Sequence, residues 1–169
     1  ILPVTYTQEQ NVTKINNKKL VGSIGILLIL LAIFFIRLPV LVFQFSDKTY
    51  FATSKQFDLG WIHSVEKEEW IEHYEINQDE LILVSTKFKT FGAGVPSYSE
   101  DVELIDGYVQ MKINQPYKEL NLTISENVDS TIYFDDKEIK IYDYGETYST
   151  VLISVEKIFI WQYWGGEFL

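Results

Sequence analysis

An uncharged apolar stretch near the N-terminus constrains the fold of this chain more than any other feature. The 17 residues Leu20–Ile36 carry no charge, and a helix through them would measure about 25 Å. The hydrocarbon core of a bilayer is about 30 Å thick, so the stretch is close to the length of a membrane span. Pro39 discourages a helix beyond Leu38. We therefore expect a transmembrane helix over residues 20–38.

The residues on either side of this stretch predict how the chain would lie in a membrane. Three lysines precede the stretch and one arginine follows it. Positive charge favours the cytoplasmic side. We expect a polar cytoplasmic tail over residues 1–19 and an extracytoplasmic domain over 39–169, in a single-pass protein of the cytoplasmic membrane.

Two other interpretations of the apolar stretch stay open. A cleaved signal peptide has a shorter apolar region, and residues 39–46 offer no small-x-small cleavage site. A helix buried in a soluble protein would need a core that covers every side of it. Both are less consistent with the sequence than an anchor.

Composition limits what the domain can bind. From residue 40 onward, ten lysines and no arginine stand against 23 acidic residues, a net charge of −13. Such a charge argues against nucleic acid, which needs a basic surface, and against lying flat on anionic lipid. The chain has no cysteine, which excludes disulfides and thiolate metal sites.

After Pro39 the apolar residues follow the period of two that is typical of strands, and turn residues interrupt them. The clearest segments are Phe57–Val65, Leu81–Phe88, Tyr108–Ile113, Leu120–Ile124, Thr131–Phe134, Glu138–Tyr142 and Thr150–Trp164. We expect an all-β domain, a β-sandwich or small barrel of about eight or nine strands.

One segment combines unusual residues. Residues 61–74 (WIHSVEKEEWIEHY) contain both histidines of the chain, four glutamates and two tryptophans. One interpretation is a hairpin with Trp61 and Trp70 in the core and the charged run at its turn. Another is a polar and aromatic surface that recognises a partner or a small ligand.

Catalytic and metal sites are less consistent with this segment. His63 and Ser64 are adjacent, so in a strand they point to opposite faces and cannot pair directly. Glutamates paired for acid–base chemistry would need a cleft that the sequence does not show. His63, Glu66, Glu72 and His73 offer nitrogen and oxygen ligands, but their spacing matches no metal motif. We predict no catalytic residues, no metal and no cofactor.

A second segment, residues 86–96 (TKFKTFGAGVP), contains a glycine-rich loop after a strand. It lacks the spacing and the Lys-Ser/Thr ending of a phosphate loop. Its two glycines permit close backbone approach, and Pro96 stiffens the exit. The loop is either a tight structural turn or a recognition loop beside the hairpin.

The two segments together resemble the bacterial domain of unknown function 1850 family, with HSVEKEEWIEHY followed by an apolar strand and TKFKTFGAGVP. The resemblance covers about residues 57–96 and extends weakly over the rest. It implies association with tripartite ATP-independent periplasmic (TRAP) transporters of the TAXI type, which import small organic anions. On the matching positions we predict one binding surface, made of His63, Ser64, Glu66, Trp70, Glu72, Tyr74, Phe91, Gly92, Gly94 and Pro96.

The resemblance and the predicted anchor together suggest a function. We expect a non-enzymatic accessory or regulatory subunit of such a transporter, with the transporter's membrane subunit or its substrate-binding protein as partner. The alternatives are an independent small-ligand or metal-binding module and, less consistent with the residues, an extracytoplasmic hydrolase.

Overall fold

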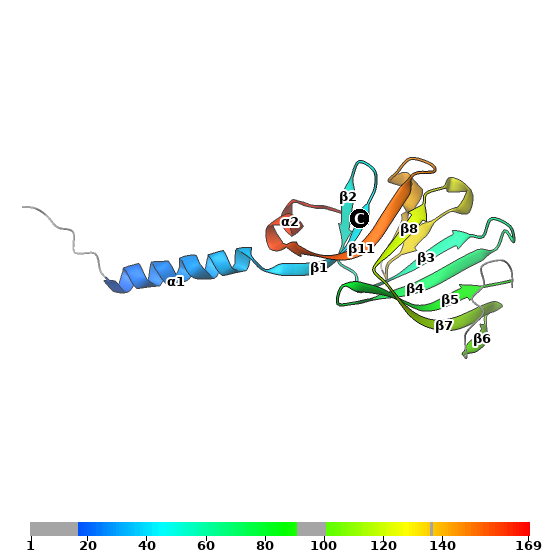
Figure 1. The fold of residues 1–169 in the computed structure, drawn as a ribbon, viewed down its shortest axis with the longest axis horizontal. Helices are drawn as coiled ribbons and strands as arrows, with labels where there is room; N and C mark the ends of the chain where they lie inside the picture. Colours follow the sequence, from blue (N-terminus) through cyan, green and yellow to red (C-terminus); the bar gives the residue numbers. More distant parts are fainter. Residues whose placement is uncertain (1–16, 91–100, 136) are drawn as a thin grey trace, which may run out of the picture. The chain divides into compact units, whose positions relative to one another are not determined.

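The computed structural model describes residues 17–90, 101–135 and 137–169. The chain divides into two units between Ile36 and Arg37. The first contains helix α1 (Asn17–Phe34), and the second contains two β-sheets and a short helix, α2 (Ile160–Gly165). Figure 1 shows these elements along the chain.

Helix α1 corrects the predicted transmembrane helix. Its 18 residues end at Phe34, whereas the prediction ran to Leu38. Arg37 and Leu38 instead begin strand β1 (Arg37–Gln44), where they pair with Phe159 and Ile158. Among the described residues, no helix combines the length and the apolarity needed to cross a membrane.

The first sheet has five strands, in the order β12-β2-β1-β11-β8. Besides β1 it contains β2 (Thr49–Ala52), β8 (Glu119–Thr123), β11 (Thr150–Phe159) and β12 (Glu167–Phe168). Strands β1 and β11 pair along eight residues and form its centre. Pro39 lies opposite Lys157, outside the part of β1 that also pairs with β2, so its missing N–H costs no bond to β2.

The second sheet has seven strands, in the order β10-β9-β3-β4-β5-β7-β6. These are β3 (Gln56–Ile62), β4 (Glu69–Asn77), β5 (Glu80–Phe88), β6 (Val102–Ile105), β7 (Tyr108–Tyr117), β9 (Thr131–Tyr133) and β10 (Glu138–Lys140). Two short 3₁₀ turns, η1 (Glu126–Val128) and η2 (Ile141–Asp143), follow β8 and β10. Strands β9 and β10, which fall within two of the strand segments that the sequence predicts, pair antiparallel.

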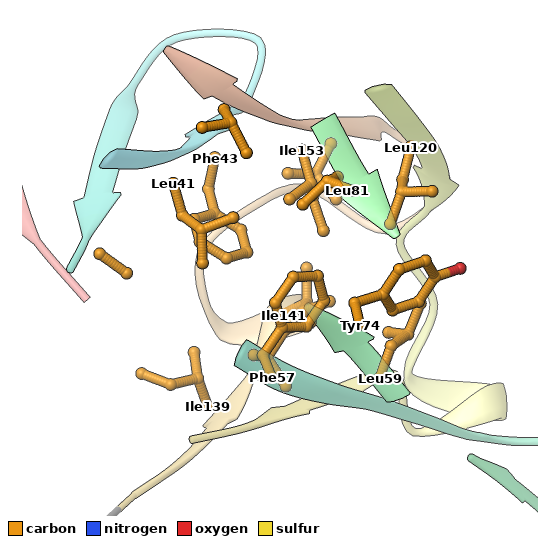
Figure 2. Packing of buried hydrophobic residues seen from close by; sticks show 14 of the residues in the cluster. Leu41, Phe43, Phe57, Leu59, Tyr74, Leu81, Leu120, Ile139, Ile141 and Ile153 are labelled. Atoms are coloured by element: carbon orange, nitrogen blue, oxygen red, sulfur yellow. The ribbon is translucent and has the colours of Figure 1, made fainter. Parts of the chain in front are cut away.

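The two sheets share one hydrophobic core. Leu41 and Phe43 of β1 and Ile153 of β11 pack in one cluster with Phe57 and Leu59 of β3, as Figure 2 shows. A smaller cluster of Trp70, Phe88, Val109 and Met111 continues along the seven-stranded sheet. We call the side of this sheet that carries Phe57 and Trp70 its inner face, and the opposite side its outer face.

Strand β5 changes register part-way along its length. Leu83 lies opposite Tyr74 and Ser85 lies opposite His73, so Val84 has no partner position on β4. Because one extra residue in a strand reverses the alternation of its side chains, Leu83 and Thr86 are both buried on the inner face. Lys87 is directed to the outer face as a result.

The prediction of a mostly β domain is confirmed. In the described residues the strands form two sheets, neither of which closes into the barrel that was one of the two expected forms. Twelve strands are described rather than eight or nine. The additional ones are mainly short, and segments of two to four residues hold too little alternation to be recognised.

Candidate functional site

The hairpin of β3 and β4 positions most of the predicted site. Trp61 lies opposite Trp70 in the ladder, and Leu59 lies opposite Glu72. Residues 63–68 form the turn, in which the His63 backbone N–H donates to the Glu68 carbonyl over 2.8 Å. Lys67 closes the turn with φ 59°, a left-handed conformation that an L-residue adopts at some cost.

Aromatic rings stack along the inner face toward the turn. The ring centroids of Trp61 and Trp70 are 5.7 Å apart with 15° between the planes, and those of His63 and Trp70 are also 5.7 Å apart. Phe88 packs on Trp70 from β5, at 5.0 Å. The Trp70 indole N–H donates a buried hydrogen bond to Thr86 Oγ1. These contacts hold the imidazole at the end of a packed column.

The turn folds back on His63. The Glu66 carboxylate contacts His63 Nδ1, and both side chains are about one-fifth exposed. The Glu66 backbone N–H also donates a hydrogen bond to the same Nδ1 over 3.4 Å. The cavity beside the pair is about 10 Å³, enough for about one water molecule. This end of the hairpin therefore offers a shaped surface rather than a ligand pocket.

Three side chains of the turn are exposed, those of Ser64, Val65 and Lys67, and we call the first two the tip of the hairpin. Ser64 is exposed, and Val65 is 74% exposed. Two contacts hold the base of the turn: Lys89 forms an ion pair with Glu68 at 3.2 Å, and the Tyr108 hydroxyl donates to Glu69 over 2.6 Å. The tip is thus presented on a fixed support.

Glu72 and Tyr74 form a separate pair deeper on the inner face. The Tyr74 hydroxyl donates to Glu72 Oε2 over 2.6 Å. Burial raises the pKa of Glu72, and the Tyr74 hydrogen bond partly opposes that rise. Burial and the neighbouring Glu72 charge likewise raise the pKa of Tyr74. Both shifts disfavour the charged forms of this pair.

A cavity of about 230 Å³ lies next to Glu72. Four apolar residues, Leu59, Trp61, Leu122 and Val128, line it together with Glu72 and three polar residues, Asn121, Thr123 and Ser130. The cavity thus has one carboxyl group of raised pKa among apolar and neutral polar side chains.

One family matches the chain. It is a domain of unknown function, DUF1850, and the match runs over residues 57–141, half of the chain. The chain is a member of the DUF1850 family. No curated protein and no solved structure matches it significantly.

The DUF1850 match corresponds to the seven-stranded sheet and one strand of the other sheet. It contains all seven strands of the second sheet apart from the first residue of β3, together with β8. The other four strands of the first sheet, and both helices, lie outside it. The predicted hairpin therefore belongs to the part of the chain that defines the DUF1850 family.

The structure brings some of the predicted site residues together. His63, Trp70, Glu72 and Tyr74 follow one another along the inner face, with Glu66 folded onto His63. Ser64 points to solvent at the tip. The four predicted loop residues, Phe91, Gly92, Gly94 and Pro96, lie outside the described residues.

The histidines and glutamates of the hairpin do not converge on one point. His73 lies on the outer face, where Nδ1 is 2.5 Å from Asp58 Oδ1, whereas Glu72 lies on the inner face. No group of three or more potential metal ligands occurs among residues that the structure describes.

Two features escaped the sequence reasoning. Val65 is the most exposed apolar residue of the hairpin, and only its position in the turn could have signalled it. The second is a groove of about 200 Å³ on the outer face, which we call the outer groove; Asp58, Ile71, His73, Ser85, Lys87 and Gln110 line it. The register change in β5 places Ser85 and Lys87 there, and no regular alternation predicts it.

Proposed function

We propose that this DUF1850 protein is a membrane-attached, non-enzymatic accessory or regulatory subunit of a TAXI-type TRAP transporter. The hairpin tip would bind the transporter's membrane subunit or its extracytoplasmic substrate-binding protein. Membership of the family supports the proposal through the transporter association that the resemblance implies.

The observation that carries the proposal is the construction of the hairpin tip. His63 is fixed by the Trp70 ring and the Glu66 carboxylate, so neither group is directed at a bound substrate. Ser64 and Val65 are exposed in front of this fixed base. Rigid surfaces of this kind bind partners at low cost in conformational entropy.

The surface of α1 supports attachment to a membrane. Apolar side chains are exposed all around the helix, among them Val21, Ile26, Leu27 and Ile29, each more than 60% exposed. A continuous apolar surface of this kind is unusual for a helix in water. Lipid or an apolar partner would cover it.

A pull-down from native membranes in mild detergent tests the proposal. Val65→Asp places a charge at the tip and leaves the His63–Glu66 contact in place, whereas His63→Ala with Glu66→Ala removes that contact. Asn77→Ala with Asp79→Ala, at the opposite end of the same sheet, is the matched control. Mass spectrometry should find transporter subunits with the wild type and the control, and far fewer with both tip variants. Absence of any transporter subunit from the wild-type sample would contradict the proposal.

A second candidate function is binding of a small carboxylate in the outer groove. Ser85 is only 7% exposed, and in the described part of the chain its hydroxyl makes no hydrogen bond. Lys87 beside it has no ion-pair partner among the described residues. Asp58 is engaged by His73. A buried hydroxyl donor next to an unpaired ammonium group suits a carboxylate.

Calorimetric titration of the full chain with hexanoate tests this second function. Lys87→Met removes the charge and keeps the length of the side chain. Lys118→Met removes a lysine that is paired with Asp79 and Glu80 instead. Binding that is lost in the first variant and kept in the second supports the function. Absence of heat with the wild type, or equal binding of hexanol, contradicts it.

A further inference from the structure

Helix α2 presents two tryptophans to solvent on one side. Trp161 is 45% exposed and Trp164 is 75% exposed. Residues three apart on a helix share a side, so the two indoles form one surface. Phe168, which follows the helix in β12, is 41% exposed as well. We call Trp161, Trp164 and Phe168 the aromatic rim.

The domain holds the aromatic rim in place. Tyr163, between the two tryptophans in sequence, packs against Val40, Val42 and Ile158 of the five-stranded sheet. After the helix, β12 pairs with β2, and the Leu169 N–H donates to the Phe51 carbonyl over 2.9 Å. The exposed indoles are therefore part of a packed element rather than of a loose end.

The rim adjoins the position where the apolar segment enters the domain. Arg37, the first residue of β1, pairs with Phe159 immediately before α2, and its guanidinium lies 4.3 Å from the centre of the Phe159 ring. The two residues that precede Arg37, Phe35 and Ile36, are exposed and apolar. The apolar segment therefore joins the domain at a residue that is paired with the one just before α2. Figure 1 shows α2 beside β1 and β2.

Exposed indoles next to an apolar segment suit one environment. Tryptophan is enriched where a membrane meets water, because its ring is apolar and its N–H needs a polar partner. Arginine at the same depth can bind lipid phosphate. We propose that the aromatic rim and Arg37 contact the headgroup region of a phospholipid bilayer and so hold the domain against the membrane surface.

The negative charge of the domain limits which lipid surfaces it can contact. With 23 acidic residues against ten lysines beyond residue 40, the domain is repelled by anionic lipid. Contact through aromatic rings requires no lipid charge. Zwitterionic phosphatidylcholine is therefore sufficient as a binding surface, and added salt should weaken only the Arg37 contribution to the contact.

Fluorescence quenching in reconstituted vesicles tests the inference, which rests on the proposed membrane attachment. The full chain is reconstituted into phosphatidylcholine vesicles with brominated or ordinary acyl chains, and tryptophan emission is compared. Brominated chains should quench the wild type. Trp161→Tyr with Trp164→Tyr should lose most of this quenching, whereas Trp61→Phe, on β3 in the aromatic stack, should keep it.

The outcomes separate the two proposals. If the wild type does not sediment with vesicles, the membrane attachment itself is wrong. If it sediments but is not quenched, or if the double variant is quenched as strongly as the wild type, attachment stands and the rim is not at the interface. Circular dichroism of the double variant confirms that the comparison is made between folded proteins.

Discussion

The indole N–H of Trp70 donates a 2.7 Å hydrogen bond to Thr86 Oγ1 across strands β4 and β5. Both side chains are buried, at 6% and 1% exposed. The bond fixes the middle ring of the aromatic column on which His63 stacks. The position of His63 therefore depends on a threonine that lies outside the hairpin.

Replacing that threonine should weaken the domain. Thr86→Val keeps the shape of the side chain and leaves the Trp70 N–H buried without an acceptor, so the free energy of unfolding should fall by about 1–3 kcal/mol. Urea unfolding, followed by circular dichroism, measures the change. Thr86→Ser retains an acceptor and should lose less than half as much; equal losses in the two variants would show that the hydrogen bond is not the cause.

Glu72 should make the domain less stable as the pH rises. Because its folded-state pKa is raised above the ordinary value of 4.5, its contribution to stability is fully present below that value and is lost as the pH rises through the folded-state pKa. Glu72→Gln removes this loss. The free energy of unfolding of the variant, relative to that of the wild type, should therefore be higher at about pH 8 than at about pH 4.

Urea midpoints at the two pH values give the comparison, and Glu75→Gln, on the same strand and exposed, is the matched control. A stability difference between Glu72→Gln and the wild type that does not change with pH would contradict the raised pKa.

The Tyr74 hydroxyl should hold the pKa of Glu72 down. Its hydrogen bond is the contribution that opposes burial, so Tyr74→Phe should raise the pKa of Glu72 further. Carbon-13 NMR of the labelled carboxyl group measures the titration directly. Tyr142→Phe, which removes a hydroxyl bonded to Asp129 instead, should leave the Glu72 titration where it is, and an unchanged pKa in Tyr74→Phe would count against this role.

Gly145 should not tolerate a side chain. A Cβ atom at this position would lie 2.6 Å from Ile124 Cδ1 and 2.9 Å from Phe45 Cδ1, and both of those side chains are buried. Gly145→Ala should therefore lower the free energy of unfolding by about 1–3 kcal/mol. Gly165→Ala, where no atom lies within 4 Å of the added Cβ, should have a much smaller effect. Thermal unfolding followed by circular dichroism measures both variants.

Local patterns predict the parts of this fold that depend on neighbours in sequence. The alternation around Phe57 and Leu59 and the turn between Trp61 and Trp70 suffice to predict the β3–β4 hairpin and its inner tryptophans. The apolar run after Lys19 predicts a helix, but its end depends on pairing between Arg37 and Phe159, which are distant in the chain. Helix α2 was expected as a continuation of β11, because its aromatic residues fit either structure.

The candidate site was predictable to a similar extent. The composition of residues 61–74 indicates an unusual segment, yet the division of His63 and His73 between the two faces follows from the pairing of β3 with β4. The outer groove depends on four strands at once, β3, β4, β5 and β7, and a sequence read along one strand contains no such information.

The bulge at Val84 determines which residues in the second half of β5 face the core. If β5 paired with β4 without this bulge, every residue beyond Leu83 would shift by one position, and Ser85 and Lys87 would take the places of Thr86 and Phe88 against Trp70. A charged ammonium group would then replace a phenylalanine in the core. A shift of one position between Leu83 and Thr86 would thus be far more damaging than most substitutions within the same strand.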